Sequence, residues 1–405
     1  MKAMMRELIQ SKAVLFFLLF ILCCSSCTKV DYTEIKDPAY LRVFNNLNYL
    51  QTMGNKDEKL PYFCLLINPT MEADGTITGG EIVGDFLNKR DAYAPPYPSH
   101  IGNSTTVDNP EFPGKQNVLV APVLNGFDLS SWAQVPSGEV RVIFAYRPKN
   151  EIPFLKLERH LRQDILIDTV LNLGSKEVYT MHLLQTDFNT KAHGLVVRQE
   201  NFHKLSLSDS LVYVNFYNMS AKGFVDADAS LKDNDYRLRS FKGGIKDEMN
   251  VYFSLYETEA NLTHNGATIP GFKGKYLTNL KRETNSTAVS PYVSFPLWAS
   301  AAGNRIYTPI WQRFEFLAPG IDITANPIFP SETETGGNWA VVNCLRNGRI
   351  ELQSRDNGTI LPNLLVNVHS GINNPQTFAT VNTIEVVNGR VYLTTIQRKY
   401  PAPIY

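Results

Sequence analysis

The sequence predicts an all-β protein of two tandem sandwich-like domains behind an N-terminal signal. Segments such as 140–144 and 212–216 place large apolar residues at every second position. Five Asn-Gly pairs are spread along the chain, and helical periodicity is scarce. Period-two alternation is typical of half-buried strands, and Asn-Gly favours the two-residue hairpin turn. These three observations together favour sheets joined by tight turns.

The chain begins with the three-part layout of a bacterial secretory signal. Lys2, Arg6 and Lys12 form a basic head, residues 13–22 are an unbroken apolar run, and two serines precede Cys27. The ten apolar residues are fewer than the roughly 20 that a transmembrane helix needs. The layout resembles lipoprotein signals, which implies that residues 1–26 are removed, that Cys27 carries the lipid (palmitate among its acyl chains), and that residues 27–37 form a tether.

Three other interpretations of this signal stay open. Cys24 is a second candidate for lipidation, and the segment is also compatible with an ordinary cleaved signal or a membrane-anchoring helix. The lipoprotein interpretation implies a lipid anchor in the outer membrane. A basic residue followed by acidic ones after Cys27 resembles the export signals of surface-exposed lipoproteins, so both the cell-surface and the periplasmic face remain open.

Charge and cysteine content narrow the function classes. Without residues 1–26 the chain keeps 36 Lys+Arg against 38 Asp+Glu, so it has no basic surplus for nucleic acid. Cys64 and Cys344 are the two cysteines outside the signal region. An oxidising compartment permits a disulfide between them. Their apolar neighbours favour two buried, inert thiols.

An internal repeat divides the mature chain. Residues 37–45 match 210–218, residues 137–142 match 347–352, and residues 173–180 match 387–394. The offset grows along the chain, which indicates about 40 additional residues in the second half. We expect one β-sandwich domain over 38–195 and a second, with expanded loops, over 205–405.

This layout resembles the repeated extracellular β domains of unknown function in lipoproteins of Bacteroidota-type bacteria. The lipobox, the opening segment 39–45, the turn at Gly138 and the closing segment 174–180 carry the resemblance. The resemblance implies immunoglobulin-like sandwiches. It carries no catalytic residues over to this chain.

No sequence pattern predicts a metal or cofactor site. The histidines form no close ligand pair, and His182 is interpreted as a sheet residue. Residues 70–81 partly resemble a calcium loop, but Thr70 occupies its first position. Residues 226–235 are acidic, but Leu231 occupies the position that needs glycine. Both segments are interpreted as solvated acidic loops, so we expect no cofactor.

Catalytic motifs are equally scarce. The G-x-S-x-G elbow is absent from the sequence, and neither Gly79-Gly80 nor Gly336-Gly337 has the spacing of a phosphate loop. A pair of carboxylates for glycoside hydrolysis depends on separation in space, which the sequence does not supply. The sequence therefore favours a protein that is not an enzyme.

Aromatic residues in loop-like segments are the remaining candidates for ligand binding. Tyr93 and Tyr97 lie among prolines, and Trp298 and Trp339 lie in the expanded part of the second half. Tyr and Trp suit sugar stacking or protein hot spots. The alternative is that they fill the sandwich core, which is the interpretation for Trp311.

Together these patterns predict a non-catalytic envelope lipoprotein that binds a polysaccharide or another envelope protein. A structural accessory subunit of an envelope assembly is the first alternative. A hydrolase without a recognisable motif is the second.

Overall fold

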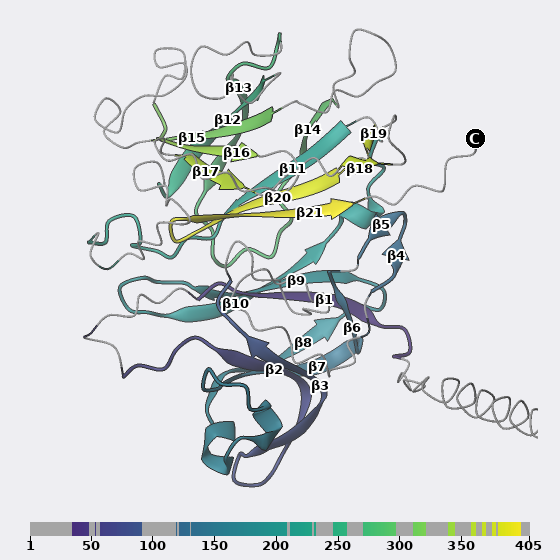
Figure 1. The fold of residues 1–405 in the computed structure, drawn as a ribbon, viewed down its shortest axis with the longest axis vertical. Coiled ribbons are helices and arrows are strands. Elements are labelled where there is room, and N and C mark those ends of the chain that lie inside the picture. The colour runs from purple at the N-terminus through teal and green to yellow at the C-terminus, as the bar shows by residue number, and fades with distance from the viewer. Residues whose placement is uncertain are drawn as a thin grey trace, which may run out of the picture. The chain divides into compact units, whose positions relative to one another are not determined.

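The computed structural model describes the chain from residue 35 to residue 397, with gaps. The described residues are 35–47, 53, 57–90, 119, 121–129, 131–208, 211–228, 231, 246–256, 270–296, 311–320, 339–344, 358–361, 367–369, 375–377 and 380–397. Residues Asp37–Tyr405 form one compact unit. The fold is all-β and consists of two tandem β-sandwiches, as predicted (Figure 1).

The first sandwich contains the strands between residues 39 and 200. Its sheets have the orders β10-β9-β1-β6 and β3-β2-β7-β8. The bounds are β1 Ala39–Asn45, β2 Phe63–Met71, β3 Ile77–Leu87, β6 Ala133–Val135, β7 Gly138–Tyr146, β8 Ile165–Leu173, β9 Val178–Gln185 and β10 His193–Glu200. β1 and β9 run parallel, and the other pairs are antiparallel.

The second sandwich contains the strands between residues 211 and 397. Its sheets have the orders β14-β11-β20-β21 and β13-β12-β15-β16-β17. The bounds are β11 Leu211–Asn218, β12 Glu248–Tyr256, β13 Lys275–Lys281, β14 Val293–Pro296, β15 Trp311–Leu317, β16 Trp339–Cys344, β17 Gly358–Leu361, β20 Thr380–Val387 and β21 Arg390–Gln397. β11 and β20 run parallel, as β1 and β9 do.

Short elements complete the described part. They are the hairpin strands β4 Val123–Leu124 and β5 Phe127–Asp128, the pair β18 Asn367–His369 and β19 Pro375–Thr377, and the 3₁₀ turns η1 Phe154–Lys156, η2 Arg159–Arg162 and η3 Phe202–Lys204.

The two sandwiches share one strand order, with β17 as the addition in the second. This order corrects two of the three sequence matches. In this order β7 corresponds to β15 and not to residues 347–352, and β9 corresponds to β20 and not to β21. The span from Tyr40 to its neighbour Val178 is 138 residues and that from Tyr213 to its neighbour Val381 is 168, so this stretch is 30 residues longer in the second half rather than about 40. Neighbouring strands of a sandwich share the same alternation, so the sequence match paired β9 with β21 instead of with its equivalent β20. Residues 347–352 lie outside the described part of the chain.

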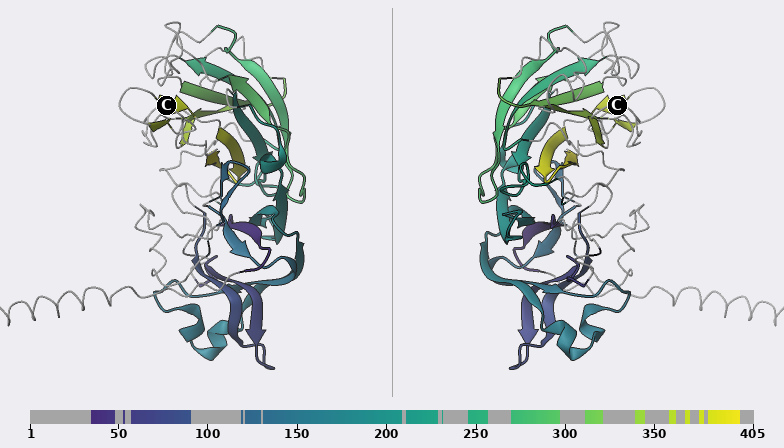
Figure 2. Two further views of the ribbon diagram at one scale, coloured as in Figure 1. Left: turned by 90° about the vertical axis from the view of Figure 1, so that its right-hand side faces the viewer. Right: turned by 90° about the vertical axis from the view of Figure 1, so that its left-hand side faces the viewer.

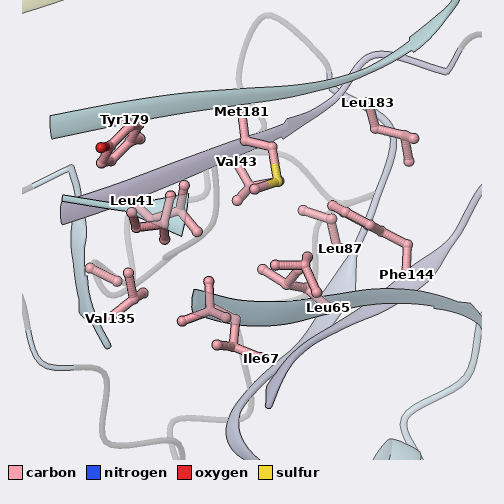
Figure 3. Packing of buried hydrophobic residues seen from close by; sticks show 14 of the residues in the cluster. Leu41, Val43, Leu65, Ile67, Leu87, Val135, Phe144, Tyr179, Met181 and Leu183 are labelled. Atoms are coloured by element: carbon pink, nitrogen blue, oxygen red, sulfur yellow. The ribbon is translucent and has the colours of Figure 1, made fainter. Parts of the chain in front are cut away.

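Alternation along the strands builds the cores. In β1 and β9, Leu41, Val43, Met181 and Leu183 point into the first sandwich, where they pack on Leu65 and other apolar side chains of the opposite sheet (Figure 3). The corresponding residues of β11 and β20 pack on β12 and β15 in the second sandwich. The intervening residues of β1, β9, β11 and β20 point the other way, toward the neighbouring sandwich.

Two features predicted from sequence are confirmed at named residues. Asn125 and Gly126 have φ of 49° and 84°, and Asn388 and Gly389 have φ of 44° and 80°, as a type I′ hairpin turn requires. Cys64 is a free, fully buried thiol on β2. Burial raises its pKa well above the ordinary value, so the thiol is held in its unreactive protonated form.

A buried ion pair fixes the β7–β8 connection in the first sandwich. The guanidinium of Arg147 pairs with Asp85 and donates to the carbonyl oxygens of Asn150 and Ile152 at 2.9 and 2.7 Å. The second oxygen of Asp85 accepts from the backbone N–H of Phe154 at 2.6 Å. The charges of Arg147 and Asp85 are therefore both compensated within the first sandwich, and we interpret the pair as structural.

Candidate functional site

The residues singled out from the sequence lie mostly outside the described part of the chain. This holds for Cys27, Tyr93, Tyr97 and Trp298. Trp339 is the first residue of β16, in register with Leu317 of β15. Because Trp339 alone of these candidates lies in the described part of the chain, the ligand-binding role proposed for them stays a prediction.

The described residues instead gather charge where the two sandwiches meet. The sheet β10-β9-β1-β6 of the first sandwich faces the sheet β14-β11-β20-β21 of the second, and the views of Figure 2 agree with Figure 1 in this layering. We call the buried ionisable residues at this meeting of the two sheets the interface cluster. It consists of Arg42, Arg90, His182, Arg198, Glu200 and Glu385.

Glu385 on β20 is the centre of the interface cluster. Its Oε2 accepts from Nη1 of Arg90 at 2.7 Å, and its Oε1 accepts from Nη2 of Arg198 at 3.0 Å. Arg90 follows β3 and Arg198 lies on β10, so one carboxylate of the second sandwich binds two cations of the first. All three side chains are at most 4 % exposed. Arg198 also donates to Glu200 of its own strand at 3.0 Å.

Aromatic faces cover the guanidinium groups. Arg42 lies 3.9 Å from the ring centroid of Trp132, and Arg90 lies 3.8 Å from that of Phe44. Contacts also cross between the sandwiches, since Arg90 is 4.1 Å from the ring of Tyr392 on β21. Arg198 is likewise 4.1 Å from the ring of Tyr217 on β11. Cation–π contacts of this kind are strongest where water is excluded.

His182 on β9 stays neutral in this setting. Its Nδ1 accepts from the Nδ2 of Asn46 at 3.0 Å, which places the ring proton on Nε2. Nε2 lies 3.3 Å from Oε1 of Glu385. Burial lowers the pKa of His182 to about 4 despite the nearby carboxylate, because it opposes the charged form.

Glu385 and Arg42 stay charged. Burial opposes ionisation of Glu385, but the guanidinium groups of Arg90 and Arg198 hold its pKa well below the ordinary value. Burial lowers the pKa of Arg42 to about 10, still above neutral pH. The cluster therefore places three guanidinium groups and two carboxyl groups around a neutral imidazole.

Apolar contacts enclose the interface cluster at both ends. At one end Tyr40 and Val178 pack in one cluster with Val381 and Ile396 of the second sandwich. At the other end Leu184 and Val196 pack with Val387 and Tyr392. Next to this second end, Nδ2 of Asn388 donates to Oε1 of Gln185 at 3.2 Å. Apolar contacts thus flank a centre from which water is excluded, as in stable protein interfaces.

This arrangement is suited to holding two bodies together. Glu385 has both oxygens bound to guanidinium groups, His182 is neutral with one ring nitrogen bound to Asn46, and each arginine contacts a carboxylate or an aromatic face. A buried charge network of this kind fixes relative orientation, because any shift would leave a charge unpaired in an apolar setting.

Of the residues 70–81, only 72–76 form a loop, because 70–71 end β2 and 77–81 begin β3. The acidic residues of this loop form ion pairs. Arg159 of η2 pairs with Glu72 and with Asp74, the latter at 2.7 Å. These hydrogen bonds lower the pKa of Asp74 to about 2. Both acids are exposed and neutralised by one cation, which agrees with their interpretation as a solvated loop.

Across the described ranges, no three His, Cys, Asp or Glu side chains are placed to hold a metal ion. No helix within those ranges has the length and apolar character to cross a bilayer. The chain matches no protein-family model and no curated protein.

Sequence reasoning missed Arg42, Arg198 and Glu385, although a signal was present. Arg42 and Glu385 each lie between two apolar residues, in Leu41-Arg42-Val43 and Ile384-Glu385-Val386. The shared strand order gives a second signal, because His182 and Glu385 occupy equivalent positions of β9 and β20.

Proposed function

We propose that this chain is a lipid-anchored protein of the cell envelope, and that its two-sandwich body is a non-catalytic binding or adhesion module. The observation that carries the proposal is the position of the compact unit behind the signal. Cys27 lies ten residues before Asp37, where the unit begins. Ten residues span at most about 35 Å when extended, so the tether would hold the body close to the membrane surface.

The interface cluster supports a display role. Two sandwiches joined through a desolvated charge network present their loops in one fixed geometry. A binding surface gains from this, because less conformational freedom is lost when a ligand binds. The ligand we propose is a polysaccharide or another envelope protein. Trp298, Trp339, Tyr93 and Tyr97 are the candidate contacts, and the outer membrane is the proposed location.

The anchoring part of this proposal is tested by Cys27→Ala. We expect the variant to leave the membrane fraction, because it lacks the thiol that accepts the lipid. Cys24→Ala is the matched control and should stay membrane-bound and incorporate labelled palmitate. Membrane association of the Cys27 variant at the wild-type level would contradict the proposed anchor, and loss of labelling in the control would transfer the role to Cys24.

The binding part is tested by affinity electrophoresis of residues 37–405 in gels that contain bacterial or host polysaccharides. We expect one glycan to retard the wild type, and the Trp298→Ala/Trp339→Ala variant to migrate as it does in an empty gel. Circular dichroism of the variant controls for unfolding. Equal retardation of both proteins would remove the tryptophans from the site, and no retardation by any glycan would direct the search to a protein ligand.

A further inference from the structure

The two sandwiches differ at one sheet edge. In the second sandwich, β16 pairs in parallel with the additional strand β17, with Val341 opposite Gly358 and Cys344 opposite Leu361. β8 takes the place of β16 in the first sandwich, and among the described strands it pairs with β7 alone (Figure 1). Within the described strands, the same edge of the same strand order thus carries an added strand in one sandwich and none in the other.

The connection after β8 is too short to supply such a strand. Four residues, 174–177, join β8 to β9, whereas 35 residues, 345–379, join β16 to β20 and include β17. A strand on β8 must therefore come from elsewhere than this connection.

The sequence of β8 lacks the Lys and Pro residues that usually protect an edge strand. The strand is nine residues long, with the sequence Ile-Leu-Ile-Asp-Thr-Val-Leu-Asn-Leu. Its single charge, Asp168, is already bound by Arg141 of β7 at 2.6 and 2.8 Å. Val170 is 55 % exposed, and Ile167 and Leu171 are only partly buried at the margin of the core. Natural proteins cover or charge such edges, because an open strand recruits another.

We infer that β8 pairs with β8 of a second copy of this chain, antiparallel and centred on Thr169. Ile167 then lies opposite Leu171 of the other copy on the core side, and Asp168 lies opposite Val170 on the outer side. Each pair occurs twice because of the two-fold symmetry. The two four-stranded sheets become one continuous sheet.

The sequence of β8 favours a second copy as the occupant. In this register every directly opposite pair projects to the same face, apolar side chains meet at the core margin, and no two like charges are opposed. Centring the pairing on Asp168 would oppose two carboxylates, which is unfavourable. A bulge beside Ile165 ends the regular pairing of β7 and β8, so residues 167–171 form the paired segment.

A charge swap at Val170 tests the pairing. Val170→Asp would place a carboxylate opposite each Asp168, and we expect the dissociation constant of the dimer to rise about tenfold. Val170→Lys is the matched control and should keep or tighten the dimer, because it places a cation there. The readout is sedimentation velocity of the full chain in mild detergent between about 1 and 100 μM, a range that brackets typical weak to moderate affinities. Circular dichroism confirms that both variants fold.

A second measurement tests the register. Thr169→Cys should form an intermolecular disulfide under mild oxidation, because the two copies of residue 169 would lie within the Cα distance that a disulfide spans. Val170→Cys should not, because its two copies would lie diagonally at about 7–8 Å. The wild-type chain, treated in the same way, measures how much cross-linking the native cysteines produce.

Three results would overturn this inference. They are a monomeric wild type across the whole concentration range, equal weakening by the Asp and Lys variants, and preferential cross-linking at position 170. If the wild type is monomeric but co-purifies with another protein, and Val170→Asp does not, then β8 pairs with a strand of that other protein.

Discussion

Replacing Glu385 with glutamine should lower the free energy of unfolding by about 3–5 kcal/mol, the usual effect of removing one partner from a buried ion pair. Glutamine keeps the shape of the side chain, so no cavity forms. The change leaves Arg90 and Arg198 with one carboxylate, Glu200, in a region where these side chains are at most 4 % exposed. Urea denaturation of residues 37–405 at neutral pH measures the loss.

Asp168→Asn is the matched control for this prediction. Asp168 also binds an arginine through two hydrogen bonds, but that pair is exposed, at 44 % and 39 % for the two side chains. Exposed pairs contribute about 0–1 kcal/mol because water screens them. Similar losses in both variants would show that Glu385 holds no special position between the sandwiches.

The free energy of unfolding should also fall as the pH is lowered from 6.5 toward 4, because His182 is neutral in the folded protein. The unfolded chain protonates this histidine near pH 6.5, whereas the folded protein does so only near pH 4. Between these values protons bind the unfolded state preferentially, which costs about 1.4 kcal/mol per pH unit and about 3 kcal/mol in all. The stabilisation is fully present above pH 6.5.

Comparison with His182→Gln isolates this effect. Between pH 6 and 5 the plot of unfolding free energy against pH should be steeper in the wild type than in the variant, by about 1.4 kcal/mol per unit. Glu385 adds an acid-dependent loss of the same sign, but only below its unfolded pKa of about 4.5. His193→Gln, at an exposed position of β10, is the control and should keep the wild-type slope. Parallel slopes in all three proteins would mean that His182 is protonated in the folded state.

The fold was predictable because its signals are local. Alternation in segments such as 140–144 predicts strands, and the Asn-Gly pairs at 125 and 388 specify turns through their backbone preference. His182 was interpreted as a sheet residue, and it lies on β9. Strand pairing was harder to predict, because neighbouring strands carry the same alternation and only hydrogen-bond register distinguishes them.

The burial of the interface cluster was not predictable from strand alternation alone. Arg42 and Arg198 occupy positions that alternate with core residues, and such positions normally face solvent. They are buried because a second sandwich covers that face, and this depends on contacts between residues nearly 200 positions apart, such as Arg198 and Glu385. The aromatic binding candidates lie in segments where period-two alternation is absent, so the sequence pattern leaves their neighbours undetermined.

The central claim is that the two sandwiches behave as one body joined by the interface cluster. Differential scanning calorimetry of residues 37–405 tests it most directly. We expect a single transition with a ratio of calorimetric to van't Hoff enthalpy of about 1, and a split into two transitions in Glu385→Gln. Two separate transitions in the wild type would contradict the account, because they would show that each sandwich unfolds independently of the other.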